Sequence, residues 1–182
     1  MKRLVTLLGL AASLAAADFQ AALDAYHRGD FATAMREWQP LAEQGDPQAQ
    51  FNLGLLYAHG PGDFRDYARA AEWYRKAAAQ DIAAAAFSLG VLYDLGQGVP
   101  QSYQQALEWY RKAADGGDAG AMTNIGVLYY NAQGVGRDLV EAYVWLARGQ
   151  KHGDPRAAEL LSWASGNMSR KQIKKAQALA GE

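Results

Sequence analysis

The chain of 182 residues contains no cysteine. This absence excludes a disulfide framework, a thiolate metal site and a cysteine nucleophile. An excess of charge of one sign is also missing, because 18 basic residues oppose 19 acidic ones and the net charge is −1. The composition therefore gives no basic surface that would predict nucleic-acid binding. A hydrophobic share of 50% is typical of a globular protein.

Residues with catalytic chemistry are scarce and scattered. The three histidines, His27, His59 and His152, lie far apart with no partner at i, i+4. No H-E-x-x-H, nucleophile elbow, P-loop or calcium loop is present. Gly96-Gln97-Gly98 and Gly134-Val135-Gly136 resemble phosphate loops, but no strand precedes them as a dinucleotide site requires. We therefore predict no catalytic residue, no metal site and no cofactor, and expect that the protein is not an enzyme.

A long hydrophobic run occurs only at the start of the chain. Met1-Lys2-Arg3 is followed by the apolar stretch Leu4–Leu14 and by Ala15-Ala16-Ala17. This order is typical of a secretory signal peptide, predicted at residues 1–17, with the mature chain starting at Asp18. The run is shorter than the ~20 residues that span a bilayer, so we expect no stable membrane insertion after cleavage. The predicted location is periplasmic or secreted; an uncleaved leader would instead indicate an intracellular scaffold.

The rest of the chain repeats itself every 36 residues. Glycine recurs at this step, as do tyrosine, tryptophan and alanine. The repeated positions are Gly54, Gly90, Gly126; Tyr57, Tyr93, Tyr129; Trp73, Trp109, Trp145; and Ala34, Ala70, Ala106, Ala142. A fixed period of this length predicts stacked supersecondary units. Apolar residues at helical spacing make each unit a helix-turn-helix, so the fold class is all-α.

The punctuation between helices divides residues 18–182 into repeats. Glycine followed by aspartate, a helix stop and an N-cap, recurs at 45–46, 117–118 and 153–154. Asp81 stands once in place of that glycine and tolerates a left-handed turn better than most residues. We expect repeats at about 18–46, 47–81, 82–118 and 119–154, with a C-terminal cap at 155–182. Capping boxes are predicted at Ser102/Gln105 and Ser169/Gln172.

The repeated glycine carries a packing prediction. Glycine inside a helix costs about 1 kcal/mol relative to alanine. Glycine recurs at Gly54, Gly90 and Gly126, which predicts that another helix approaches closely there. We expect the small side chains of Ala70, Ala106 and Ala142 to lie opposite these glycines. The aromatic pairs Trp73-Tyr74 and Trp109-Tyr110 would fill the space between the layers.

The pattern A-x-x-x-L-G-x-L-Y…G-x-G-V…A-x-x-W-Y-R-K-A-A resembles the Sel1-like repeat, a relative of the tetratricopeptide repeat. Ala49/Leu53-Gly54/Tyr57, Ala85/Leu89-Gly90/Tyr93 and Ala121/Ile125-Gly126/Tyr129 carry the likeness. Three departures are Pro61-Gly62-Asp63 in a loop, Leu146 after Trp145, and Ala132 in place of a loop glycine. The resemblance implies a right-handed α/α superhelix with capping helices at both ends. It also implies a scaffold for protein–protein interaction in the bacterial envelope.

The resemblance leaves a second function open. A branch of the family is linked to β-lactam binding or hydrolysis. The alternative function is therefore a small envelope hydrolase, or a protein that binds cell-wall glycan or β-lactam. That branch is rich in cysteine and this chain has none.

By analogy with tetratricopeptide solenoids, the first helix of each repeat lines a concave groove. The residues expected there share one helix face. They are Phe51, Asn52, Leu55, Phe87, Val91, Asp94, Thr123, Asn124, Val127, Tyr130 and Trp163. Aromatic rings with a few amides suit a protein or peptide partner, either an extended peptide or a helix. The other interpretation is that the large apolar members pack adjacent first helices together.

The last predicted helix, Arg170–Ala180, has one basic face. Arg170, Lys171, Lys174 and Lys175 form it. We expect this face to be solvated; contact with an acidic partner or a lipid surface is the alternative.

Overall fold

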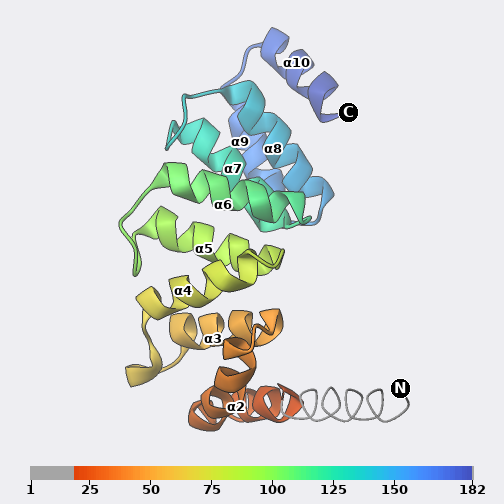
Figure 1. Cartoon of the computed structure of the whole chain (residues 1–182). Helices are drawn as coiled ribbons and strands as arrows, with labels where there is room; N and C mark the ends of the chain where they lie inside the picture. Colours follow the sequence, from red (N-terminus) through yellow and green to blue (C-terminus); the bar gives the residue numbers. More distant parts are fainter. Residues whose placement is uncertain (1–18, 182) are drawn as a thin grey trace, which may run out of the picture. The chain divides into compact units, whose positions relative to one another are not determined.

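The computed structural model describes residues 19–181, and all the regular secondary structure in that range is helical (Figure 1). The signal peptide predicted at residues 1–17 lies outside the described residues. The chain divides into two compact units, one up to Gln80 and one from Asp81.

The first unit begins with a helix over residues 19–27. It continues with α2 (Phe31–Glu43), α3 (Pro47–His59), the 3-10 helix η1 (Gly62–Phe64) and α4 (Tyr67–Ala78). Consecutive helices pack on one another, α2 on α3 and α3 on α4. Trp38 of α2 is buried and contacts the rings of Phe19 and Tyr26, which close the start of the unit.

The second unit holds six helices in its described part. They are α5 (Ala83–Leu95), α6 (Tyr103–Asp115), α7 (Ala119–Asn131), α8 (Leu139–Lys151), α9 (Ala157–Gly166) and α10 (Arg170–Ala180). Each helix from α5 to α8 packs on the next one, whereas α10 packs back on α8. This succession of helix pairs is the arrangement of a repeat solenoid, as the 36-residue period predicts. We call α3, α5, α7 and α9 first helices and α4, α6 and α8 second helices.

Side-chain caps begin the helices where the sequence predicts them. The carboxylates of Asp46 and Asp118 accept hydrogen bonds from backbone N–H groups three residues on, at 2.8 and 2.7 Å. The box at Ser169 is complete. The box predicted at Ser102 is wrong in one half, because the Ser102 backbone N–H donates to the carbonyl oxygen of Tyr93 and not to the Gln105 side chain. The predicted left-handed turn at Asp81 is confirmed by its φ of 62°.

The repeated glycines lie where two helices of one repeat touch. A Cβ added to Gly54 would lie 2.5 Å from the ring of Tyr74, and one on Gly90 would lie 2.6 Å from the ring of Tyr110. In the next repeat Leu146 takes the place of the tyrosine against Gly126. The prediction of a close approach is therefore confirmed.

The residues that cover these glycines differ from the prediction in one respect. The tyrosine after the repeated tryptophan supplies the nearest atoms in α4 and α6. The predicted alanine is among the nearest neighbours at Gly126, where the backbone oxygen of Ala142 lies 3.0 Å from the added Cβ. A flat ring can lie directly on a glycine backbone, which explains why the second helix brings an aromatic residue there. Tyr74 and Tyr110 are accordingly buried, at 1% and 0% exposure.

No helix in the described range 19–181 has the length and hydropathy needed to cross a membrane.

Candidate binding surface

The exposed side chains of α5, α7 and α9 form what we call the first-helix surface of the second unit. Its members share one face of their helices. They are Phe87, Val91 and Asp94 from α5, Asn124, Val127 and Tyr130 from α7, and Leu160 and Trp163 from α9. All are partly exposed except Trp163, which is 60% exposed and is the most open aromatic of this set. Every predicted groove residue of this unit except Thr123 lies on this surface.

Three of the predicted residues lie in the first unit, on α3. Phe51, Asn52 and Leu55 are partly exposed there. The Phe51 ring contacts the buried ring of Tyr74, with centroids 5.9 Å apart. This phenylalanine therefore helps hold its own repeat together and still leaves part of its ring open.

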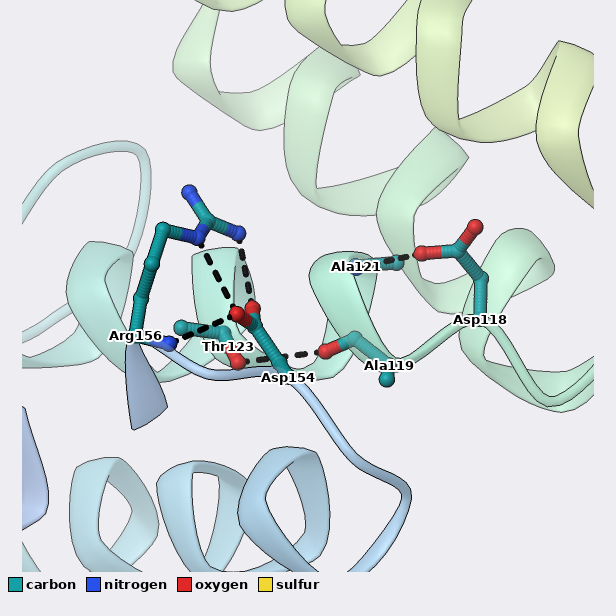
Figure 2. Close-up of polar contacts among 6 residues, drawn as sticks. All are labelled: Asp118, Ala119, Ala121, Thr123, Asp154 and Arg156. Carbon is teal, nitrogen blue, oxygen red and sulfur yellow. Dashed lines mark hydrogen bonds and ion pairs between the residues drawn. The ribbon is translucent and has the colours of Figure 1, made fainter. Parts of the chain in front are cut away.

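Thr123 is a wrong prediction, because its side chain is fully buried at 0% exposure. Its hydroxyl donates to the carbonyl oxygen of Ala119 at 3.1 Å, as Figure 2 shows, and Gly149 of α8 lies against it. The corresponding position carries Phe51 and Phe87 in earlier repeats, where a larger side chain extends outward beside the tyrosine. Threonine is too short to do this and faces the partner helix.

A polar cluster occupies the middle of the surface. The hydroxyl of Tyr110 donates to Oδ2 of Asp94 at 3.0 Å, and Asn124 of α7 is partly exposed on the same surface. Burial raises the pKa of the Asp94 carboxyl above its ordinary value, and the hydrogen bond from Tyr110 offsets part of the rise. Burial also raises the pKa of Tyr110, and the Asp94 charge adds to that effect. Tyr110 is thus the neutral donor that fixes the Asp94 side chain.

An aromatic cluster lies on the same face toward the end of the unit. The rings of Tyr130 and Trp163 have centroids 4.7 Å apart and an interplanar angle of 33°. The Arg137 guanidinium lies 5.5 Å from the centroid of Tyr130. A cavity of about 30 Å³ is lined by these two rings together with Val127, Leu146 and Leu160. Such a cluster offers large contact area at low entropic cost, as aromatic anchors do in protein interfaces.

An ion pair fixes the turn into α9. The Asp154 carboxylate is 5% exposed and accepts from the Arg156 guanidinium at 2.8 Å and from the Arg156 backbone N–H at 2.9 Å (Figure 2). Burial acts to raise the pKa of Asp154, but the hydrogen bonds and the charge of Arg156 act in the opposite direction, and the pKa lies below its ordinary value. Arg156 in turn acts electrostatically on Tyr110. The pair therefore places one cation beside the polar cluster.

Sequence reasoning missed three contributors to this surface. Tyr110 packs on Gly90 in the contact that recurs in each repeat, and the sequence predicted only this packing. Its hydroxyl also orients Asp94. Leu160 and Arg156 lie 36 residues after Asn124 and Gly120, so the period could have found their positions. Their residue types differ from those of the earlier repeats, and nothing in the pattern marked them.

The side chains of the surface supply apolar and hydrogen-bonding groups. Among residues 19–181, no group of three histidine, aspartate or glutamate side chains could hold a metal ion. The surface offers aromatic faces, aliphatic side chains, the amide of Asn124 and the carboxylate of Asp94, and the guanidinium of Arg137 lies over Tyr130. Groups of these kinds can form apolar contacts and hydrogen bonds with a peptide.

The chain is built of successive helix pairs, and in each pair a glycine of the first helix lies against the second helix. This architecture defines an α-helical repeat protein. Residues 47–82, 83–118 and 119–154 each match the family model of the Sel1 repeat. The chain therefore belongs to the Sel1 repeat family, whose members are generally non-catalytic scaffolds for protein–protein interaction.

Two solved structures are similar to the chain. The crystal structure of c5321, a protective antigen of uropathogenic Escherichia coli strains with an SLR fold, shares 36% identity over 82% of this chain, with a TM-score of 0.75. A Sel1 repeat protein from Oxalobacter formigenes shares 32% identity over 86% of this chain, with a TM-score of 0.74. The chain spans 32% of the length of the first and 67% of the second. The search of curated proteins gave no match.

Proposed function

We propose that this protein is a non-catalytic adaptor of the bacterial envelope that binds a peptide or a helix of a partner protein on its first-helix surface. The observation that carries the proposal is the combination of Tyr130 and Trp163 with Asp94 and Asn124 on one face, where the Tyr110 hydroxyl holds the Asp94 carboxylate. The aromatic pair supplies apolar anchoring. The carboxylate and the amide supply hydrogen-bond groups for a peptide backbone or a polar side chain.

The leader-like sequence supports the envelope location. A positive start, the apolar run Leu4–Leu14 and three alanines are the order that secretion requires. Expression in a Gram-negative host followed by fractionation and intact mass measurement tests this part. The expected product is a periplasmic chain that starts at Asp18, and a full-length cytoplasmic chain would contradict the location.

Site-specific photo-crosslinking tests the binding surface. A photoreactive amino acid is placed at Val91 or at Asn131, next to the aromatic pair, and a control chain carries it at Lys171 on α10. We expect a discrete adduct from the first two positions in envelope preparations and none from Lys171. Adducts of the same size from all three positions, or none from the first two, would contradict the proposed surface.

A double variant, Val91→Glu and Val127→Glu, checks that the adduct reflects binding. It places two charges in the apolar part of the surface, and crosslinking from Asn131 should fall at least tenfold. Circular dichroism and the melting temperature establish that the variant is folded. An exposed leucine outside the surface, Leu179→Glu on α10, is the matched control and should leave the adduct unchanged.

A further inference from the structure

The exposed side of α10 carries four cations, and the helix contains no acidic residue. Arg170, Lys171, Lys174 and Lys175 are all exposed, as expected for a solvated face, and we call them the α10 basic face. Their i, i+1, i+4, i+5 spacing places them on one side of the helix. Helix α10 packs on α8 through its other side, where Ala176 is fully buried. The four charges therefore face away from α8.

The charges of this face have no counter-charge in the fold. Within residues 19–181, none of the four cations forms an ion pair with a carboxylate. Arg170 and Lys171 lie in the first turn of α10, which contains no acid. Free backbone N–H groups give the start of a helix a partial positive charge, so cations there are unfavourable. Neither ion pairing nor helix stability therefore explains the cluster.

The cluster also opposes the charge of the rest of the sequence. The net charge is −1 with these four cations included, so the remaining residues carry a net charge of −5. An anionic surface repels such a chain on average, and only a local group of cations can attract it. Two further exposed cations at the end of α8, Arg148 and Lys151, line a cavity of about 310 Å³ with Ala180 and Gly181. Exposed positive charge is thus present at both ends of α10.

We propose that the α10 basic face binds the surface of an anionic lipid bilayer. Such a surface presents many phosphate charges in one plane, and lysine and arginine side chains close to it are attracted without specific contacts. The apolar side of α10 is packed on Val140, Tyr143 and Val144 of α8 and is not available for insertion. The helix therefore contacts the headgroups through its cations.

A lipid surface fits this face better than an acidic protein does. Three of the four cations are lysines, a residue type that is depleted at protein interfaces. The exposed side of α10 adds only Gln177, Ala178 and Leu179 to the cations and has no aromatic anchor. A plane of headgroup charges requires no such anchor.

This inference goes beyond the proposed peptide binding and does not depend on it. The cations concerned lie on α10, whereas the residues of the first-helix surface lie on α5, α7 and α9. Each proposal can therefore fail while the other holds.

Vesicle flotation tests the inference. The purified full chain is mixed in about 0.1 M NaCl with vesicles of phosphatidylcholine alone, or of phosphatidylcholine with about 30% phosphatidylglycerol. Wild type should bind the vesicles with phosphatidylglycerol at least tenfold more tightly. About 0.5 M NaCl should remove this difference, because salt screens the attraction between exposed charges. Equal binding to both kinds of vesicle at low salt would overturn the proposal.

Three double variants assign the attraction to α10. Lys171→Gln with Lys174→Gln should weaken binding at least tenfold, since each cation near an anionic surface contributes about fivefold. Arg28→Gln with Lys76→Gln removes the same charge from exposed sites of the first unit and should leave the affinity unchanged. Lys171→Arg with Lys174→Arg keeps the charge and should bind like wild type. All these chains share one N-terminus, so any binding by residues 1–17 is common to them.

The melting temperature supplies an independent readout. Because cations near the start of a helix are unfavourable, Lys171→Gln with Lys174→Gln should fold and should not melt at a lower temperature than wild type. A clear decrease would show that these lysines stabilise the fold, and would overturn the argument that their role lies outside it.

The proposal is also overturned if the glutamine variant binds the vesicles as tightly as wild type, or if the first-unit variant loses as much affinity. A soluble polyglutamate peptide that binds wild type more tightly than the vesicles do would overturn it in favour of an acidic protein. A dimer of the protein alone in sedimentation, dissociated by the glutamine variant, would overturn it in favour of a second copy of this chain.

Discussion

The hydroxyl of Tyr110 donates a hydrogen bond to the carboxylate of Asp94 at 3.0 Å, from a side chain that is itself 0% exposed. The ring of the same tyrosine lies on Gly90, one turn before Asp94. One residue therefore both joins the two helices of its repeat and fixes a polar group on the candidate binding surface.

Asp94→Asn should make stability less dependent on pH. Burial raises the pKa of Asp94 in the folded state, so the folded protein holds this proton more tightly than the unfolded chain does. The stabilisation from the protonated carboxyl is fully present below the unfolded value of 3.8 and is lost as pH rises through the higher folded value. Urea unfolding from pH 3.5 to 7 should show wild type losing stability relative to Asp94→Asn as pH rises. A constant difference between the two proteins would contradict the raised pKa.

Asp154→Asn should destabilise the protein by about 1–3 kcal/mol at pH 7, because it weakens charge-assisted hydrogen bonds to a nearly buried group. The pKa of Asp154 is lowered, so this contribution is present above the unfolded value and lost as pH falls through the folded value. Chemical unfolding measures both effects. Asp115→Asn, at an exposed site on α6, is the control and should change stability by less than about 0.5 kcal/mol. Equal effects of the two substitutions would show that the Arg156 pair contributes nothing.

Gly90→Ala should cost about 1–3 kcal/mol, because its Cβ would lie 2.6 Å from the Tyr110 ring and the packed ring has to move. The better helix propensity of alanine offsets part of this loss. Gly136→Ala provides the comparison, since an added Cβ there has no neighbour within 4 Å. Thermal unfolding should show a clear decrease in melting temperature for Gly90→Ala alone. If the two variants have the same melting temperature, Gly90 is not required for the contact with Tyr110.

Ala132→Gly should stabilise the protein by about 0.5–1 kcal/mol. Ala132 ends α7 with a φ of 57°, a left-handed conformation that strains any residue with a Cβ. Relief of this strain exceeds the entropy that glycine adds to the unfolded chain. Ala79→Gly tests the argument, because Ala79 ends α4 with an ordinary φ of −65° and should lose stability on the same change. A gain at both positions, or at neither, would refute the strain.

The sequence predicted the repeated parts of this molecule well for a physical reason. A glycine in mid-helix and an aspartate before a helix each have few roles. Their return every 36 residues at Gly54, Gly90 and Gly126 made the close helix contact a secure prediction. The identity of the covering residue was less secure, because both Ala106 and Tyr110 lie on the inner face of α6.

The candidate surface could be predicted only in outline. The period located one face of each first helix, but it could not show that Thr123 is too short to reach solvent. The position of α10 was also beyond it, because the C-terminal cap departs from the repeat. Whether α10 packs on α8 or on α9 depends on which of these helices offers the larger apolar face. The apolar pattern of α10 alone does not show this.

In two successive repeats of the second unit, the residue that covers the glycine and the side chain exposed beside it differ together. Where the second helix carries Tyr110, the first helix carries Asp94 to meet its hydroxyl. One repeat later Leu146 has no hydroxyl, and the position of Asp94 is taken by Tyr130, which stacks on Trp163 instead. A carboxylate at position 130 would meet Leu146, and no phenol, at the place that Tyr110 takes in the preceding repeat. Moving the Asp94 carboxylate to another repeat would therefore require a tyrosine at the position of Tyr110 in that repeat as well.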